Sequence, residues 1–211
     1  MFSLLYRDFK ILKKTWTFYF GLLYFLFLLP VTQKGSFFTQ TYLQYFLFIY
    51  FSYLIFAYLT AYDYKYNALT FIPALPITKK DIVAARYLLA GITFLLCLVL
   101  QHIAKAIILL KDNQAIIFNQ LVNYAHIGMI FIAFSLFFSI IIPLYYKLDY
   151  QATRWVMYIA MLLTVAVTGM LTGIIPNPNQ PWFLLTALGT GLFLLLFSFR
   201  FSVRILENKN L

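Results

Sequence analysis

Residues that could do chemistry are rare in this sequence, and their spacing matches no catalytic motif. The 211 residues include six Asp or Glu, two His and one Cys. Glu207 is the single glutamate, and His102 and His126 stand far apart, so neither an HExxH zinc motif nor a pair of glutamates is present. No GxxxxGK[ST] loop is present to hold ATP phosphates. The sequence therefore predicts a chain that is not an enzyme and that binds no metal and no cofactor itself.

Three polar residues stand together near the end of an apolar stretch. Gln101, His102 and Lys105 fall at positions i, i+1 and i+4, a helical spacing that could line a polar pathway. The alternative is that this stretch ends in the membrane interface, where Lys105 extends its ammonium group to water. Cys97 lies in an apolar run and is interpreted as a small buried hydrophobic residue.

The segment LPITKKDIVAARYL (75–88) places charges just before another apolar stretch. Thr78 stands three residues before Asp81, which is the spacing of a capping box at a helix start. Lys79 and Lys80 oppose the positive end of the helix dipole, so another interaction must favour them. Lipid headgroups are one such partner, and an acidic protein surface is another.

The elements that must hold these residues are membrane helices. Hydrophobic residues make up 64% of the chain and charged residues 10%, which is too few charges to cover a soluble domain. Charge-free stretches of about 18 or more residues are long enough to cross a bilayer as helices. The turn-forming segment NPNQP at 177–181 divides the longest stretch in two. The predicted fold is one all-α integral membrane domain over 1–211, with six transmembrane spans at about 15–31, 41–61, 82–105, 123–146, 155–175 and 182–201.

The positive charges predict the orientation of these spans. With the N-terminus in the cytoplasm, 13 of the 16 Lys and Arg residues fall on the inner side, and Lys34, Lys105 and Lys111 fall outside. Both termini are then cytoplasmic. The net charge of +10 indicates contact with anionic membrane lipid rather than with nucleic acid.

Two further patterns concern how helices meet the membrane and each other. Over about 1–14, an amphipathic helix is predicted to lie in the inner interface. Its apolar positions are Phe2, Leu5, Phe9 and Leu12, continued by Trp16, and its basic positions are Arg7, Lys10 and Lys14. Gly169 and Gly173 form a GxxxG pattern in the fifth span, which permits close helix packing.

The segment at 75–88 resembles part of a known family. It is similar to the Leu-Pro-[Val/Ile]-[Ser/Thr]-[Arg/Lys]-x-[Asp/Glu]-Ile-Val-x-x-[Arg/Lys]-Tyr-Leu segment of small bacterial permease subunits of ABC-2 type transporters. That group includes the permeases of phenol-soluble modulin exporters and related peptide-antibiotic exporters, which have a type V exporter-like fold. The six-span topology is similar over nearly the whole chain.

The resemblance implies a place in a larger assembly. Two permease subunits, as a homodimer or a heterodimer, would pair in the bacterial cytoplasmic membrane, and two ABC ATPase subunits would bind their cytoplasmic faces. ATP and Mg²⁺ would be bound by the ATPase. The first inner loop, about 62–86, would dock on the ATPase, and the N-terminal helix would be the family's connecting helix. The contact candidates in this coupling loop are Asp63, Lys65, Tyr66, Leu69, Lys79, Lys80 and Asp81.

The predicted function is that of the permease subunit of an ATP-driven exporter. The aromatic-rich spans suggest a hydrophobic or amphipathic substrate such as a peptide, an antimicrobial or a lipid, although lipid-facing helices have the same composition. The alternative is a membrane protein without ATPase coupling, such as an assembly factor, an immunity protein or a sensor anchor. A third interpretation, an intramembrane enzyme, would require an activity that depends on His102 or His126.

Overall fold

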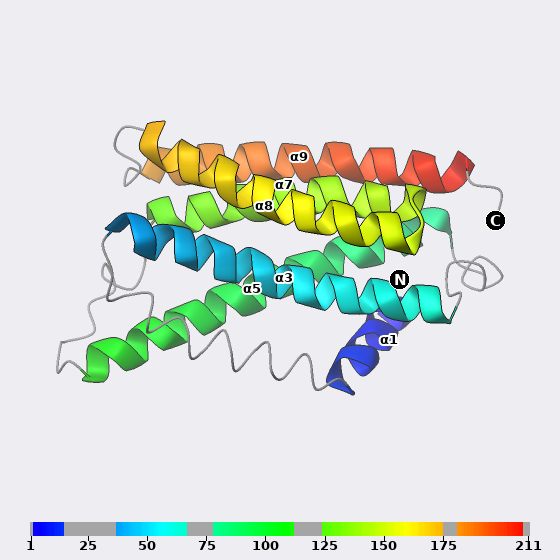
Figure 1. The fold of residues 1–211 in the computed structure, drawn as a ribbon, viewed down its shortest axis with the longest axis horizontal. Coiled ribbons are helices and arrows are strands. Elements are labelled where there is room, and N and C mark those ends of the chain that lie inside the picture. The colour runs from blue at the N-terminus through cyan, green and yellow to red at the C-terminus, as the bar shows by residue number, and fades with distance from the viewer. Residues whose placement is uncertain (1, 15–36, 67–77, 112–123, 175–180, 209–211) are drawn as a thin grey trace.

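The computed structural model describes residues 2–14, 37–66, 78–111, 124–174 and 181–208. Within these ranges the regular elements are α-helices: α1 (Phe2–Lys13), α3 (Phe37–Lys65), α5 (Lys79–Lys111), α7 (Tyr124–Lys147), α8 (Tyr150–Ile174) and α9 (Pro181–Asn208). The five long helices run lengthwise through the molecule, and the short α1 lies across one end of them (Figure 1).

Five of the predicted spans correspond to helices that are long and apolar enough to cross a membrane, namely α3, α5, α7, α8 and α9. The predicted span at 15–31 lies outside the described residues. The helices are longer than the charge-free windows suggested: α3 continues from 61 to Lys65, and α9 continues from 201 to Asn208. Long cationic side chains near a helix end can reach water, so a charge does not mark the point where the helix stops.

Most charged residues of the five long helices gather at one end of the molecule, on the right in Figure 1, and Lys105 and Lys111 near the end of α5 are exceptions. There α3, α7 and α9 end, and α5 and α8 begin. Lys65, Lys79, Lys147, Arg154 and Arg204 all belong to these helix ends. This is called the charged end below.

Helix α7 is the centre of the bundle. In the apolar window of α7, 67% of the residues are buried within the protein, compared with 22% for α9. The ring centroids of Phe134 and Phe138 on α7 are 4.6 Å apart, and the ring of Phe94 on α5 lies 4.8 Å from that of Phe134. Edge-to-face and tilted aromatic contacts of this kind add to the energy of burial.

Two glycines allow α7 and α9 to pack closely. A Cβ atom at Gly191 on α9 would lie 2.5 Å from the ring of Phe131 and 2.6 Å from Ser135 Oγ, both on α7. At Gly128 on α7, a Cβ atom would lie 3.0 Å from the ring of Phe183. Small residues at such crossings let helix backbones approach in a membrane. The sequence pattern had instead singled out Gly169 and Gly173 on α8; Gly169 is buried, and the surroundings of Gly173 lie outside the described residues.

A proline inside α7 creates a further link between helices. Pro143 has no backbone N–H, so the carbonyl of Ser139, four residues earlier, loses its usual donor within the helix. Ser198 Oγ on α9 donates to this carbonyl at 2.8 Å. Tyr87 Oη on α5 lies 2.6 Å from Ser198 Oγ and can donate to it. The break in α7 is thus satisfied by its neighbours, as membrane helices require, and it joins α5, α7 and α9.

Candidate functional site: a buried ion cluster at the charged end

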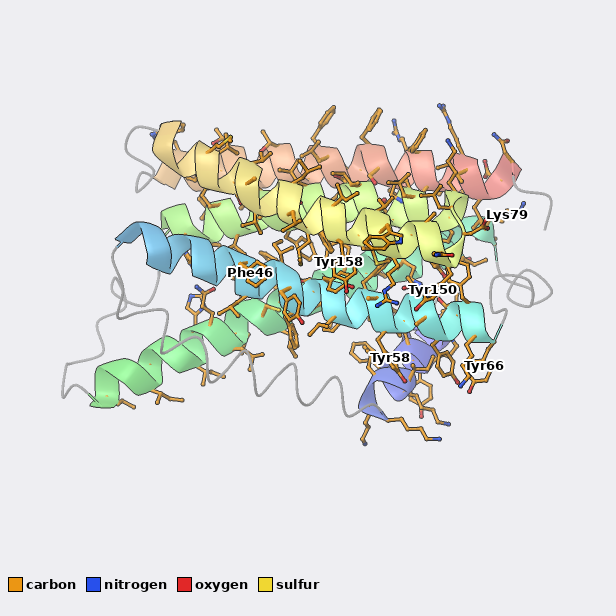
Figure 2. All side chains as sticks on the ribbon, in the orientation of Figure 1. Phe46, Tyr58, Tyr66, Lys79, Tyr150 and Tyr158 are labelled. Carbon is orange, nitrogen blue, oxygen red and sulfur yellow. The ribbon has the colours of Figure 1, made fainter. Side chains whose placement is uncertain are left out.

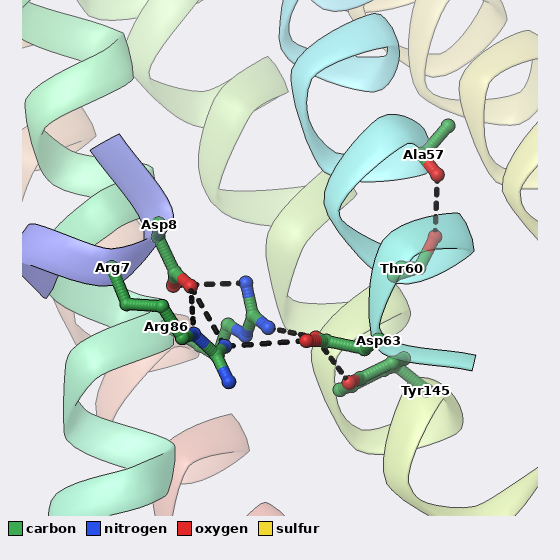
Figure 3. Close-up of polar contacts among 7 residues, drawn as sticks. All are labelled: Arg7, Asp8, Ala57, Thr60, Asp63, Arg86 and Tyr145. Carbon is green, nitrogen blue, oxygen red and sulfur yellow. Dashed lines mark hydrogen bonds and ion pairs between the residues drawn. The ribbon is translucent and has the colours of Figure 1, made fainter. Parts of the chain in front are cut away.

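Four ionised side chains and a tyrosine meet inside the charged end (Figure 3). They are contributed by α1, α3, α5 and α7 and are called the ion cluster: Arg7, Asp8, Asp63, Arg86 and Tyr145. The side chains of Asp8 and Asp63 are each 1% exposed, and that of Arg86 is 5% exposed. Buried ionised residues are rare because leaving water is costly, so this cluster requires an explanation.

The two carboxylates of the cluster share the two arginines. Asp63 Oδ1 lies 3.2 Å from Arg7 Nη2, and Asp63 Oδ2 is paired with Arg86 Nη2. Asp8 Oδ1 lies 2.8 Å from Arg7 Nη2, and Asp8 Oδ2 lies 3.1 Å from Arg86 Nη1. The two positive and two negative charges balance, so their mutual attraction offsets the free-energy cost of removing them from water.

Tyr145 fixes the cluster to the central helix. Its hydroxyl donates to Asp63 Oδ2 at 2.8 Å. The guanidinium carbon of Arg86 lies 5.7 Å from the centroid of the same ring, within the range of a cation–π contact. Tyr145 therefore contacts both members of the Asp63–Arg86 ion pair, and this contact holds the end of α3 and the start of α5 against α7.

The space within the cluster is too small for a substrate. The adjoining cavity has a volume of about 10 Å³ and is lined by Arg7, Asp8 and Arg86 together with apolar residues and two tyrosines. A cavity must reach about 10–15 Å³ to hold a single water molecule. The cluster consequently joins helices and has no room for cargo.

The buried face of α1 is what brings Asp8 into the cluster. Leu4, Leu5, Ile11 and Leu12 are buried on the same side as Asp8, whereas Tyr6, Phe9, Lys10 and Lys13 are exposed. The amphipathic pattern had placed Phe9 on the apolar face and Arg7 on the basic face. In the structure Phe9 is 43% exposed and Arg7 contacts Asp63, because the face that includes Asp8 packs on α3 and α5.

The start of α5 has the local geometry of a capped helix. The Thr78 hydroxyl lies 3.2 Å from the Asp81 amide nitrogen, which donates to it, and Thr78 Oγ1 lies 2.7 Å from Asp81 Oδ2. The neighbouring Lys79 donates to the backbone carbonyl of Glu207 at 3.2 Å. The start of α5 is therefore attached to the last turn of α9.

The predicted coupling-loop residues occupy different environments. Lys65, Tyr66 and Lys80 are exposed, and Lys79 and Asp81 are partly exposed. Figure 2 shows Tyr66 and Lys79 at the same end of the molecule. Asp63 is enclosed by the ion cluster, so its carboxylate faces Arg86 and Tyr145 and no surface that a partner could reach. Leu69 lies outside the described residues.

The three polar residues predicted to line a pathway, Gln101, His102 and Lys105, do not form one group in the structure. Gln101 is buried, and its amide nitrogen is hydrogen-bonded to His126 Nε2 on α7. His102 Nδ1 lies 2.7 Å from the Leu98 carbonyl of its own helix. The side chain of Lys105 lies outside the described residues. The structure therefore brings Gln101 and His126 together, a pair that the sequence spacing did not identify, while His102 bonds back to α5.

The described part of the chain holds no group of three or more His, Cys, Asp or Glu that could bind a metal ion. The arrangement at the charged end is chemically one of fixed ion pairs and hydrogen bonds.

Comparison with known proteins identifies the family. A family model described as an ABC-2 family transporter protein matches residues 3–207, so the chain belongs to that family. No curated protein and no solved structure matches the chain. Membership confirms the resemblance drawn from 75–88, makes this chain a membrane component of a transporter, and implies a partnership with an ABC ATPase.

Sequence reasoning had missed most of the ion cluster: Arg7, Arg86 and Tyr145 as partners of Asp63, and Asp8 as the second carboxylate that pairs with the two arginines. A signal was present. Asp63 and Arg86 each lie within one or two turns of a strongly apolar stretch, where an ionised group needs an opposite charge. The sequence did not indicate that α1 packs against the end of α3 and the start of α5, and this contact brings Arg7 and Asp8 to Asp63 and Arg86.

Proposed function

We propose that this chain is the permease subunit of an ATP-driven exporter and that its charged end receives the motion of the ATPase. The observation that carries this proposal is the ion cluster, which joins α1, α3, α5 and α7 at the two ends of the first inner loop, through Asp63 and Arg86. A loop that docks on a motor must be attached to the spans by contacts that do not yield. Ion pairs that cost several kcal/mol to break have this property.

The partner-facing surface is formed by the exposed residues at this end. Lys65, Tyr66 and Lys80 are exposed, and Lys79 is partly so. The Lys65 ammonium group lies 5.6 Å from the Tyr66 ring centroid, so these two side chains form one patch. We assign the direct contacts with the ATPase to this surface and to Leu69, and we assign Asp63 a positioning role through Arg86.

Displacement of the loop would reach the spans by two routes. One is the ion cluster, through Arg86 to Asp63 and Tyr145 on α3 and α7. The other is the hydrogen bond from Lys79 to the carbonyl of Glu207, which attaches α5 to α9. Helices joined in this way move as a block, and such shifts are the usual form of switching in packed proteins.

The remaining parts of the assembly follow from the family. Two copies of the permease, identical or different, pair in the bacterial cytoplasmic membrane with both termini and the charged end in the cytoplasm, and two ATPase subunits bind ATP and Mg²⁺. Helix α1 lies in the inner interface, because its exposed side carries Tyr6 and Phe9 beside Lys10 and Lys13. The cargo is hydrophobic or amphipathic, such as a peptide, an antimicrobial or a lipid.

The decisive experiment reverses one charge at each end of α5, Lys80 or Lys111. The permease is purified from its native membrane together with any ABC ATPase that it retains, and the rate of ATP hydrolysis is measured in the complex. Lys80→Glu, at the charged end, should weaken binding of the ATPase and lower permease-dependent hydrolysis by about fivefold or more, because it would place like charges together against an acidic partner surface, which costs several kcal/mol. Lys111→Glu, at the opposite end of the same helix, is the matched control and should leave hydrolysis unchanged.

Two results would contradict the proposal. If no ABC ATPase co-purifies and hydrolysis never depends on this chain, the protein is a membrane protein without ATPase coupling. If Lys80→Glu and Lys111→Glu behave alike, the charged end is not the surface that meets the motor.

A further inference from the structure

A second feature of the charged end, on the opposite side of α3 from α1, has no part in the ion cluster. Between α3 and α8 lies an open cavity of about 240 Å³. Its lining consists of Tyr53, Ala57 and Thr60 on α3 and Tyr150, Arg154 and Met157 on α8. In Figure 2, Tyr150 and Tyr158 lie along the junction of these two helices. We call this cavity the α3–α8 hollow.

The lining of the hollow is positive and rich in hydroxyl groups. Arg154 is its one charged residue, and the ion pairs found among the described residues are those of Arg7 and Arg86, so no carboxylate neutralises Arg154 there. Tyr158, one turn further along α8, packs against Tyr53, with the two ring centroids 5.1 Å apart. An exposed arginine beside tyrosine side chains suits a phosphate group, which accepts several hydrogen bonds and is recognised by the planar guanidinium.

The size of the hollow limits what it can hold. It is smaller than the roughly 300–1,000 Å³ of pockets that enclose drug-sized ligands. Its width depends on Ala57, whose methyl group is the smallest side chain in the lining. A headgroup fits this space, whereas a folded peptide does not.

The depth of Arg154 matches the headgroup layer. Arg154 stands four residues after Tyr150, the first residue of α8, which is about 6 Å along a helix axis. Each headgroup region of a bilayer is roughly 5–7 Å thick. Beyond this level the exposed surface of α8 is apolar, with Ile159, Leu162 and Leu163 all more than half exposed. A ligand with its phosphate at Arg154 therefore has an apolar surface on which acyl chains can lie.

We propose that the α3–α8 hollow is a binding site for the phosphate headgroup of an anionic phospholipid from the leaflet at the charged end. The guanidinium of Arg154 binds the phosphate, Tyr150 and Tyr158 offer hydroxyl groups beside it, and Ala57 leaves the space for the glycerol portion. The proposal does not involve the ATPase, so the test of lipid binding is independent of the test of the proposed transport function.

The test measures lipid binding to the purified full chain in detergent by native mass spectrometry. The probes are phosphatidylglycerol, which is anionic, phosphatidylcholine, whose phosphate is offset by choline, and inorganic phosphate alone. Phosphatidylglycerol should bind tightly to the native chain. Arg154→Gln should weaken that binding about tenfold or more, because the charge-assisted hydrogen bonds from the guanidinium to the phosphate are lost.

Two further variants distinguish binding in the hollow from general electrostatic attraction between the protein and anionic lipid. Ala57→Leu fills the hollow while keeping Arg154. It should weaken the binding of phosphatidylglycerol as strongly as Arg154→Gln does. Arg204→Gln is the matched control, because this exposed arginine stands four residues before the end of α9 just as Arg154 stands four residues after the start of α8. It should change the affinity by no more than about twofold.

Three outcomes would overturn the proposal. Unchanged binding in both Ala57→Leu and Arg154→Gln would show that the hollow is not the site. Equal losses in Arg154→Gln and Arg204→Gln would reduce the effect to general electrostatic attraction. Binding of inorganic phosphate as tight as that of phosphatidylglycerol would identify a soluble anion as the ligand. Arg154→Lys, which keeps the charge, should retain part of the affinity and serves where Arg154→Gln fails to fold.

Discussion

The ion cluster predicts a strong energetic coupling between Asp63 and Arg86. Asp63→Asn keeps the shape of the side chain but removes its charge, so Arg7 and Arg86 are left with Asp8 as the one carboxylate. The Tyr145 hydroxyl keeps an acceptor in the amide oxygen. Removing one partner of a buried ion pair destabilises a protein by about 3–5 kcal/mol. At about 2–4 °C per kcal/mol for a chain of this length, the midpoint of unfolding should fall by about 6–20 °C.

The double variant Asp63→Leu/Arg86→Met tests the physical cause. Replacing both partners of a buried pair by apolar residues of similar volume is often neutral or stabilising. Here the Tyr145 hydroxyl would lose its acceptor, which costs about 1–3 kcal/mol. The double variant should still be more stable than either single variant of the same cycle, Asp63→Leu or Arg86→Met, and the coupling energy should reach about 2–3 kcal/mol.

The assay is thermal unfolding of the purified chain in detergent, followed by tryptophan fluorescence, with a double-mutant cycle over the two positions. Lys65→Gln is the matched control, because it removes an exposed charge two residues after Asp63 and should change stability by no more than about 0.5 kcal/mol. Additive losses, within about 0.5 kcal/mol, would refute the reasoning, since the two side chains would then act independently. So would a Lys65→Gln variant as unstable as Asp63→Asn.

Two further predictions concern α7 and α9. Gly191→Ala should destabilise the protein by about 1–3 kcal/mol, because its Cβ atom would overlap the ring of Phe131, whereas Gly189→Ala, with open space around it, should be neutral or slightly stabilising; equal effects in thermal unfolding would contradict the close approach. Ser198→Ala should cost about 0.6–1.7 kcal/mol by leaving the Ser139 carbonyl without a donor. In a Pro143→Ala background the helix supplies its own N–H, so the same substitution should cost measurably less, and an unchanged cost would rule out the proposed link.

The sequence was sufficient to predict the helices but not their partners. Hydropathy and length located α3, α5, α7, α8 and α9, because each must satisfy its own backbone in lipid. Residue spacing along one helix also placed the Thr78–Asp81 pair, which is local. The ion cluster, by contrast, joins Arg7 and Asp8 to residues far away in the chain, and the meaning of Gly191 depends on Phe131 of another helix. Spacing within one segment contains no information about such contacts.

The placement of the two interhelical networks on α7 has a mechanical consequence. Tyr145 connects α7 to Asp63 on α3, and the Ser139 carbonyl connects it, through Ser198, to α9 and Tyr87 on α5. These two connections lie on either side of Pro143, where α7 lacks a backbone hydrogen bond and where helices bend most readily. A displacement of the charged end that reaches Tyr145 can therefore tilt the last turns of α7 relative to the part fixed by Ser198. Within the described bundle, and with the ATPase docked at the charged end as proposed, motion of the ATPase could change the packing of the spans at the point between the two networks without breaking either network.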